Sequence, residues 1–131
     1  MTEKIIWIVD DDPIYQIIVN KIIKRAVCHS AVDSFKNGKE AIDALQDTIH
    51  KNNNTPDIIL LDINMPIMDG WEFMEELNQI EVLATKKIKI YIVSSSIAIE
   101  DKNKSKNYNS ILGYLSKPIT IDDITYITST N

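Results

Sequence analysis

The sequence predicts an α/β fold in which a parallel five-stranded sheet is covered by helices on both faces. Three observations lead to this prediction. Short runs of apolar and β-branched residues alternate with segments of helical periodicity along the 131 residues. The runs end near positions 9, 35, 61, 93 and 115, and each interval is long enough for a right-handed strand–helix–strand crossover. Four of the five runs lead into charged or hydroxyl residues, and such residues gather at the carboxyl edge of a parallel sheet.

Each element of the N-terminal half has its own signal. Ile5–Val9 is almost continuously apolar, as expected of a strand that is buried on both faces. Pro13 favours a helix start, and the apolar spacing predicts a helix over 13–27 whose inward face contains Ile14, Ile17, Ile18, Ile22 and Ala26. A second strand is expected over Ser30–Phe35. The turn signal Asn37-Gly38 then precedes a helix marked by Ala41, Ile42, Leu45 and Ile49.

The C-terminal half continues the alternation. The third strand, Asp57–Leu61, leads through a loop with two helix breakers to a helix whose inward face contains Trp71, Met74 and Leu77. Ile88–Val93 is the fourth strand, and the polar segment 98–107 is expected to form a short, marginally stable helix. The fifth strand, Ile111–Leu115, precedes a helix over 121–129 in which β-branched residues lower the helix propensity.

Composition limits the class of protein. A chain of 131 residues that is 44% hydrophobic predicts a single domain over residues 1–131. No apolar run is long enough to span a membrane and no secretory signal is evident, so we expect a cytoplasmic location and no membrane partner. The single cysteine, Cys28, is expected to be a small buried residue rather than a reactive thiol. The net charge of −5, without interleaved aromatic and basic residues, argues against direct nucleic-acid binding.

The charge is unevenly distributed along the chain. Residues 84–117 contain seven lysines and two acids, a local charge of +5, so the remaining residues sum to −10. Two interpretations stay open. The basic segment could meet an acidic or phosphorylated partner, or it could be a solvated helix face.

The residues that follow the strands predict a cation and phosphoryl site. Asp10, Asp11 and Asp12 follow the first strand, and Asp62 the third, while Ser94 and Lys117 follow the last two. Converging carboxylates repel one another unless a cation is present, and Mg²⁺ prefers oxygen ligands. A cation and a lysine could together neutralise the charge on a transferring phosphoryl group. Asp12 is expected at the exposed start of the first helix, where it would interact favourably with the helix dipole. We expect it to have no catalytic role.

Taken together, these segments resemble a known family. Val9-Asp10-Asp11, the run from Leu61-Asp62 through Asn64-Met65-Pro66 to Asp69-Gly70, Val93-Ser94-Ser95 and Lys117-Pro118 are similar in order and spacing to the receiver domain of two-component response regulators. The likeness is greatest to single-domain, chemotaxis-regulator-like members. It implies a flavodoxin-like (βα)5 three-layer sandwich with a sheet of order 2-1-3-4-5. It also implies a phosphoacceptor switch in a phosphorelay.

The resemblance assigns a role to each matching residue. Asp62 would take a phosphoryl group, with the help of Mg²⁺, from the phosphohistidine of a sensor histidine kinase or a histidine phosphotransfer protein. Asp11, Asp62 and the backbone carbonyl of Asn64 would bind Mg²⁺ directly, and Asp10 would do so through water. Lys117 would pair with the phosphoryl group and Ser94 would hydrogen-bond to it. Tyr114 matches an aromatic switch position, and the peptide bond before Pro118 is expected to be cis.

Further consequences concern partners and activity. The face around residues 97–129 is expected to bind an unidentified downstream protein. The domain would catalyse only its own phosphorylation and dephosphorylation. Ser96 lacks the acidic side chain that some relatives have at this position, so the lifetime of the aspartyl phosphate is left open.

Other functions are disfavoured by single residues. A Mg²⁺-dependent aspartyl-phosphate phosphohydrolase or phosphomutase would need an acid two residues after the nucleophile, where Asn64 stands. A flavin carrier would need a hydroxyl- and glycine-rich loop after the first strand, where three aspartates would repel a phosphate. A passive interaction module would not need Asp11, Asp62 and Lys117. The chain could equally be a receiver domain cut from a longer regulator or hybrid kinase.

Overall fold

The computed structural model describes residues 3–80, 87–95 and 98–129, and these residues form a doubly wound α/β fold. In chain order the elements are β1 (Lys4–Val9), α1 (Pro13–Ala26), β2 (Ser30–Phe35), α2 (Gly38–His50), β3 (Ile58–Leu61), α3 (Gly70–Ile80), β4 (Lys89–Ser94), α4 (Ile99–Ser105), β5 (Ile111–Ser116) and α5 (Ile121–Ser129). The strands pair in parallel in the order β2-β1-β3-β4-β5. This order confirms the predicted fold class, and the predicted elements agree with the observed ones to within a few residues at their ends.

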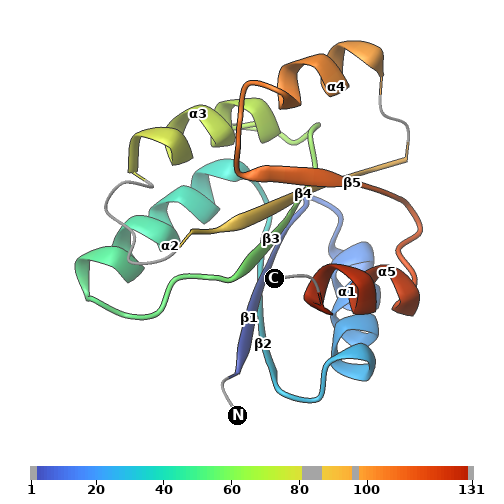
Figure 1. Cartoon of the computed structure of the whole chain (residues 1–131). Coiled ribbons are helices and arrows are strands. Elements are labelled where there is room, and N and C mark those ends of the chain that lie inside the picture. Colours follow the sequence, from blue (N-terminus) through green and yellow to red (C-terminus); the bar gives the residue numbers. More distant parts are fainter. Residues whose placement is uncertain (1–2, 81–86, 96–97, 130–131) are drawn as a thin grey trace.

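The helices form two layers, one on each face of the sheet. Helices α1 and α5 lie together on one face, and α2, α3 and α4 lie on the other (Figure 1). Alternate residues of the central strands point into the two layers, because side chains alternate along a strand. Trp7 and Val9 of β1 pack with α2 and α3, whereas Ile6 and Ile8 pack with α1 and α5. The continuous apolar runs of the sequence therefore reflect burial on both sides.

Side-chain caps define several of the helix starts. Asp12 precedes α1 and accepts hydrogen bonds from the backbone N–H groups of Ile14 and Tyr15, as the sequence predicts for a residue at the helix start. Asn37 caps α2 in the same way, through the N–H of Glu40. Because these caps hold the helix starts, they also hold the loops that follow β1 and β2.

The predicted inward face of α1 is confirmed for Ile22 and Ala26 and is wrong for three isoleucines. Ile14, Ile17 and Ile18 are 68%, 59% and 50% exposed, whereas the fully buried residues of the helix are Val19 and Ile23. Tyr15, Ile22 and Ala26 are partly buried against the same core. The helix contains two overlapping apolar stripes, and spacing alone does not decide which of them packs on the sheet. The stripe that does not pack on the sheet consists of Ile14, Ile17 and Ile18, and it is exposed to solvent.

The prediction for Cys28 is also wrong, because this cysteine is exposed. It lies between the end of α1 and the start of β2, where the chain turns at the surface. A small apolar residue has no core to enter at such a turn. Among the helices of the described residues, none combines the length and the apolar character needed to cross a membrane.

Candidate functional site

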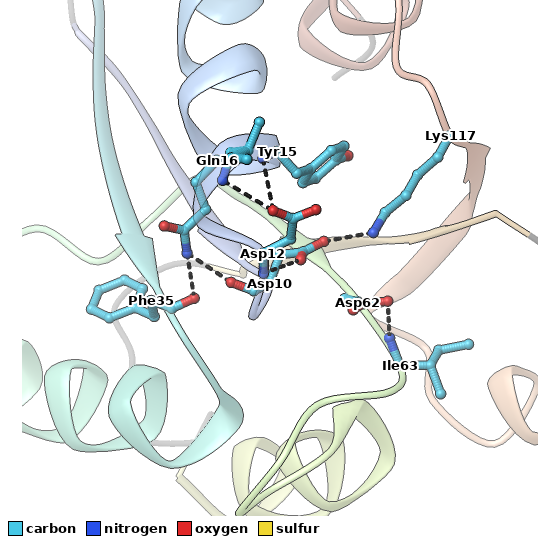
Figure 2. Close-up of polar contacts among 9 residues, drawn as sticks. Asp10, Asp12, Tyr15, Gln16, Phe35, Asp62, Ile63 and Lys117 are labelled. Carbon is cyan, nitrogen blue, oxygen red and sulfur yellow. Dashed lines mark hydrogen bonds and ion pairs between the residues drawn. The ribbon is translucent and has the colours of Figure 1, made fainter.

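The carboxyl ends of the strands bring the predicted residues of the site together. Asp10 comes directly after β1, Asp62 directly after β3 and Lys117 directly after β5. Figure 2 shows the side chains of Asp10 and Lys117 in contact, with Asp62 beside them. Asp10, Asp11 and Asp62 each place a carboxylate oxygen within 4.8 Å of the others. Residues that are far apart in the sequence thus form one acidic cluster with an adjacent lysine.

Asp10 is the buried centre of the cluster, with an exposed fraction of 2%. Its Oδ1 accepts a hydrogen bond of 2.9 Å from the backbone N–H of Asp12, and its Oδ2 pairs with the Lys117 ammonium at 2.8 Å. Both carboxylate oxygens therefore already have a donor. Asp10 is therefore better suited to orient its neighbours than to bind a cation directly.

Asp62 is nearly as buried, at 9% exposed, but its charge is less well compensated. Its Oδ1 accepts a hydrogen bond of 2.9 Å from the N–H of Ile63. Burial raises the pKa of Asp62 to about 6, and the negative charges of Asp10 and, to a smaller extent, Asp11 act in the same direction. Lys117 and the Ile63 N–H oppose this rise in pKa without cancelling it. The site has an excess of negative charge that a cation would relieve.

The donor set fits a hard divalent cation. Three carboxylates with mutually close oxygens are the kind of ligands that Mg²⁺ prefers. A cation there would also offset the burial and the charge of Asp10 that raise the pKa of Asp62. The exposed Asp11 makes the cluster accessible from solvent. The side chain of Asn64 is exposed, and a ligand role for its backbone carbonyl stays a prediction.

Lys117 is held over the site by backbone and side-chain contacts. Its N–H donates to the carbonyl of Ser94 at 3.0 Å, and its bond to Pro118 is cis, as the resemblance implies. Its ammonium lies 4.3 Å from the centroid of the Tyr15 ring while it pairs with Asp10. The lysine side chain is 24% exposed, so it remains partly accessible to solvent.

The backbone beneath Asp62 depends on a close approach by Gly70. A Cβ atom on Gly70 would lie 2.6 Å from the carbonyl oxygen of Asp62 and 2.9 Å from the Cα of Ile63. The Gly70 N–H also donates to the Ile63 carbonyl at 2.8 Å. Any side chain at this position would push α3 away from the strand end. The glycine that the sequence marks only as a breaker therefore sets the position of the Asp62 loop.

Ser94 and Tyr114 occupy different parts of the molecule. Ser94 is the last residue of β4, at 7% exposed, and lies at the same sheet edge as the acidic cluster. The hydroxyl of Tyr114 contacts the Ser105 hydroxyl and donates to the Lys102 carbonyl at 3.2 Å. Tyr114 thus joins β5 to α4 and is not part of the acidic cluster. Ser96 lies outside the described residues.

Two residues near the site were not identified from the sequence. Gln16 donates through Nε2 to the carbonyls of Asp10 at 2.7 Å and Phe35 at 2.9 Å, and so it ties the ends of β1 and β2 together. Tyr15 packs its ring against Lys117 (Figure 2). Both belong to the first turns of α1, directly after the three aspartates. That proximity is the only signal in the sequence that could have found them.

Comparisons with known proteins point to one family. A family model described as the response regulator receiver domain matches residues 6–128. The chain is 24% identical over 120 residues to a probable methanogenesis regulatory protein, FilR2, of Methanothrix harundinacea, covering 92% of this chain and 76% of that protein. It is 29% identical over 125 residues to the DNA-binding transcriptional regulator NtrC of Escherichia coli K12, covering 94% of this chain and 24% of NtrC. The chain therefore spans only about a quarter of NtrC.

Solved structures agree with the family match. A two-component response regulator from Cytophaga hutchinsonii superposes with a TM-score of 0.85 at 26% identity, covering 98% of this chain and 96% of that one. The chemotaxis protein CheY4 of Vibrio cholerae gives a TM-score of 0.79 over 97% of each chain, and at 22% identity it supports the fold alone.

Proposed function

Because this chain belongs to the response regulator receiver family, and so is a phosphoacceptor switch of two-component signalling, we propose that Asp62 is the residue that becomes phosphorylated. The observation that carries this proposal is the position of Asp62 between Asp10, Asp11 and Lys117 at the carboxyl edge of the sheet. Asp62 lies at the end of the central strand, with acids on one side and a lysine on the other. Asp10, by contrast, already has donors on both of its carboxylate oxygens.

The transfer follows from the side chains of the site. A carboxylate oxygen of Asp62 attacks the phosphorus of a phosphohistidine, the phosphorus–nitrogen bond breaks, and the imidazole leaves with the bonding electrons. Its pairing with Asp10 keeps the Lys117 ammonium in the site. From there the ammonium can contact the phosphoryl oxygens. Ser94, at the same edge, is the proposed hydroxyl donor to the phosphoryl group, and Tyr114 the residue that responds on the α4 side.

Mg²⁺ is the proposed cofactor. Asp11, Asp62 and the carbonyl of Asn64 would hold it directly and Asp10 through water, because both oxygens of Asp10 already have donors. When bound, the cation supplies positive charge against the carboxylates and the phosphoryl oxygens. Asp62 must be ionised to act as a nucleophile, and the nearby positive charge of Lys117 favours that state.

The proposed partners divide between two faces. The phosphohistidine donor must reach Asp62, and the exposed Ile14, Ile17 and Ile18 of α1 lie next to the aspartates that begin that helix. We expect this apolar row, called here the α1 isoleucine patch, to dock the donor protein. The downstream protein would bind the face around residues 97–129, which contains α4, β5 and α5. We expect the domain to catalyse only its own phosphorylation and dephosphorylation. A single receiver domain over 1–131 and a cytoplasmic location stay predictions.

A direct test uses a small phosphodonor, so that no partner is needed. The protein is treated with acetyl phosphate or phosphoramidate and Mg²⁺, and the intact protein is weighed. One added phosphoryl group is expected, and it should be absent with EDTA or in Asp62→Asn. Asp69→Asn is the matched control, because Asp69 is a carboxylate of the same loop that caps α3 through the N–H of Glu72. Labelling of Asp62→Asn would refute the assignment.

A further inference from the structure

Tyr15 combines features that packing alone does not explain. It is in the first turn of α1, and its ring packs partly into the core formed by β1, α1 and α5. Its hydroxyl oxygen is fully buried and has no hydrogen-bond partner. An unpaired buried hydroxyl lowers stability. Because it makes no hydrogen bond, the Tyr15 hydroxyl does not hold the side chain in place. The ring is the part of Tyr15 that makes a specific contact.

That contact is with the ammonium of Lys117. The Lys117 Nζ atom lies 4.3 Å from the ring centroid, well inside the range of a cation–π interaction. The same atom pairs with Asp10 at 2.8 Å, so the ammonium is held between a carboxylate and an aromatic face. Figure 2 shows the ring on the α1 side of the site, across from the segment after β5 that carries Lys117. The segment Ser116–Lys117 and the start of α1 are therefore joined through this ring.

A lysine has a long flexible side chain, and ordering it costs conformational entropy. Asp10 alone fixes one point of the ammonium and leaves the methylene chain free to swing towards solvent. A second contact on an aromatic face restricts this motion, and the restriction is already present before a phosphoryl group arrives. The ordering cost is then not incurred during the transfer step.

We infer that Tyr15 is a positioning residue, whose ring holds the ammonium of Lys117 beside Asp62 in readiness for the phosphoryl group. The inference rests on the proposed role of Asp62. It assigns the effect to the ring and none to the hydroxyl. Consequently Tyr15→Phe, which keeps the ring, should behave like the wild-type protein, whereas an aliphatic residue of similar size should not.

The first measurement reports on Lys117 in the resting protein. An aromatic face shifts nearby protons upfield, so the ε-methylene resonance of Lys117 should stand apart from those of the other lysines in spectra of ¹³C-lysine-labelled protein. Its assignment comes from its loss in Lys117→Arg. The upfield position should persist in Tyr15→Phe and return to the usual range in Tyr15→Leu. Tyr15→Met serves the same purpose if the leucine variant does not fold.

The second measurement is the rate at which acetyl phosphate labels Asp62 at saturating Mg²⁺. Loss of a cation–π contact corresponds to a rate decrease of roughly 2- to 30-fold in Tyr15→Leu, and Tyr15→Phe should restore the rate. Val19→Ala is the matched control, because Val19 is an aliphatic residue of the same helix and belongs to the core cluster against which Tyr15 packs. It should keep both the resonance and the rate.

Three results would overturn the inference. They are an unchanged Lys117 resonance in the aliphatic variants, a labelling rate in those variants equal to or above the wild-type rate, or a Tyr15→Phe variant as slow as Tyr15→Leu. An equal loss in Val19→Ala would show that packing, and not the ring, is responsible. Labelling that survives in Asp62→Asn would instead refute the proposed function, and the resonance of Lys117 would still test the ring contact by itself.

Discussion

Asp10, Asp11 and Asp12 are consecutive residues with three different environments. Asp10 is buried and paired with Lys117, Asp11 is exposed beside Asp62, and Asp12 is the N-cap of α1. A turn at the end of a strand separates them, because the chain reverses from β1 into a helix within these residues. Three identical residues in the sequence therefore make different contributions to the proposed metal site and to stability.

Single substitutions should separate these contributions. We expect Asp11→Ala to weaken Mg²⁺ binding by at least the roughly tenfold loss typical of even an indirect metal partner, with little change in the free energy of unfolding. Asp12→Ala should leave Mg²⁺ affinity close to the wild-type value but lower the free energy of unfolding by about 1 kcal/mol, because the helix loses its cap. Calorimetric titration with Mg²⁺ and urea unfolding in EDTA measure the two effects. Equal losses of affinity in both variants would contradict the assignment.

The raised pKa of Asp62 predicts a dependence of stability on pH. Its pKa is about 6 in the folded protein and about 3.9 in an unfolded chain, so the folded state binds more protons between these values. Stability contributed by this group is therefore present at low pH and decreases as pH rises from about 4 to about 6. In EDTA at pH 7.5, Asp62→Asn should be more stable than the wild-type protein, by at most about 3 kcal/mol.

The difference between the two proteins should shrink as the pH falls to 4, and it should also shrink when Mg²⁺ is added to the wild-type protein at pH 7.5. Urea unfolding across this pH range measures it. A difference that does not change with pH would mean that burial of the ionised carboxylate is not its cause.

At the scale of elements, α1 has a role on each of its faces. Its buried stripe packs with α5 and places Tyr15 and Gln16 next to the site, whereas the α1 isoleucine patch remains in solvent. An exposed row of three isoleucines beside the proposed phosphorylation site suggests a surface that is covered by a partner at some stage of the reaction. The proposed phosphohistidine donor is the partner that would approach this edge.

We expect the variant with Ile14, Ile17 and Ile18 all changed to serine to be phosphorylated at least about tenfold more slowly by a phosphohistidine-bearing phosphotransfer domain. Its labelling by acetyl phosphate should be unchanged, because the patch does not touch the reacting groups. Ile99→Ser is the matched control, since Ile99 is 76% exposed but belongs to α4 on the other face of the sheet. Parallel loss with both donors would indicate a damaged site instead of a lost docking surface.

Helix α4 is held mainly by polar contacts. Ser105 is its single buried residue among the seven. The Trp71 Nε1 atom donates to Asp101 at 3.2 Å, and the Trp71 ring stacks on Tyr108, which itself donates to Glu75 at 2.7 Å. On the other side, Tyr114 contacts Ser105 and Lys102. Such contacts contribute little individually, so the helix can change its arrangement at low cost, in keeping with the marginal stability that its sequence predicts.

At the scale of the whole molecule, the sheet and its functional edge could be predicted because their signals are local. Each buried strand is a short apolar run, and the residue that follows it must lie at the carboxyl edge. The face of α1 could not be predicted, because two apolar stripes compete for the sheet. The contact between Tyr15 and Lys117 could not be predicted either, because it depends on how α1 and the end of β5 are placed by the intervening layers. The same is true of the close approach of Gly70 to Asp62.

Strands β4 and β5 connect the site to α4. Ser94 ends β4 next to the acidic cluster, the Lys117 N–H is bonded to the Ser94 carbonyl, and Tyr114 extends from β5 to α4. A phosphoryl group that draws Ser94 and Lys117 inward would therefore act on the strand that holds α4. If the inactive arrangement is favoured about 100-fold, inverting that ratio needs about 5.5 kcal/mol of differential interaction.

Hydrogen exchange with and without beryllofluoride, a phosphoryl mimic, should locate this response. With Mg²⁺ present, we expect changed protection both in the loops after Asp11 and Asp62 and within residues 98–117, because the weakly held α4 is coupled to the site through β5. Asp62→Asn should show no response, which controls for nonspecific effects of the reagent. Lys117→Ala should still respond in the loop after Asp62 but lose the response in α4, since the ammonium is the link to β5. Changes confined to the two loops in the wild-type protein would mean that the α4, β5 and α5 side is not the surface that switches.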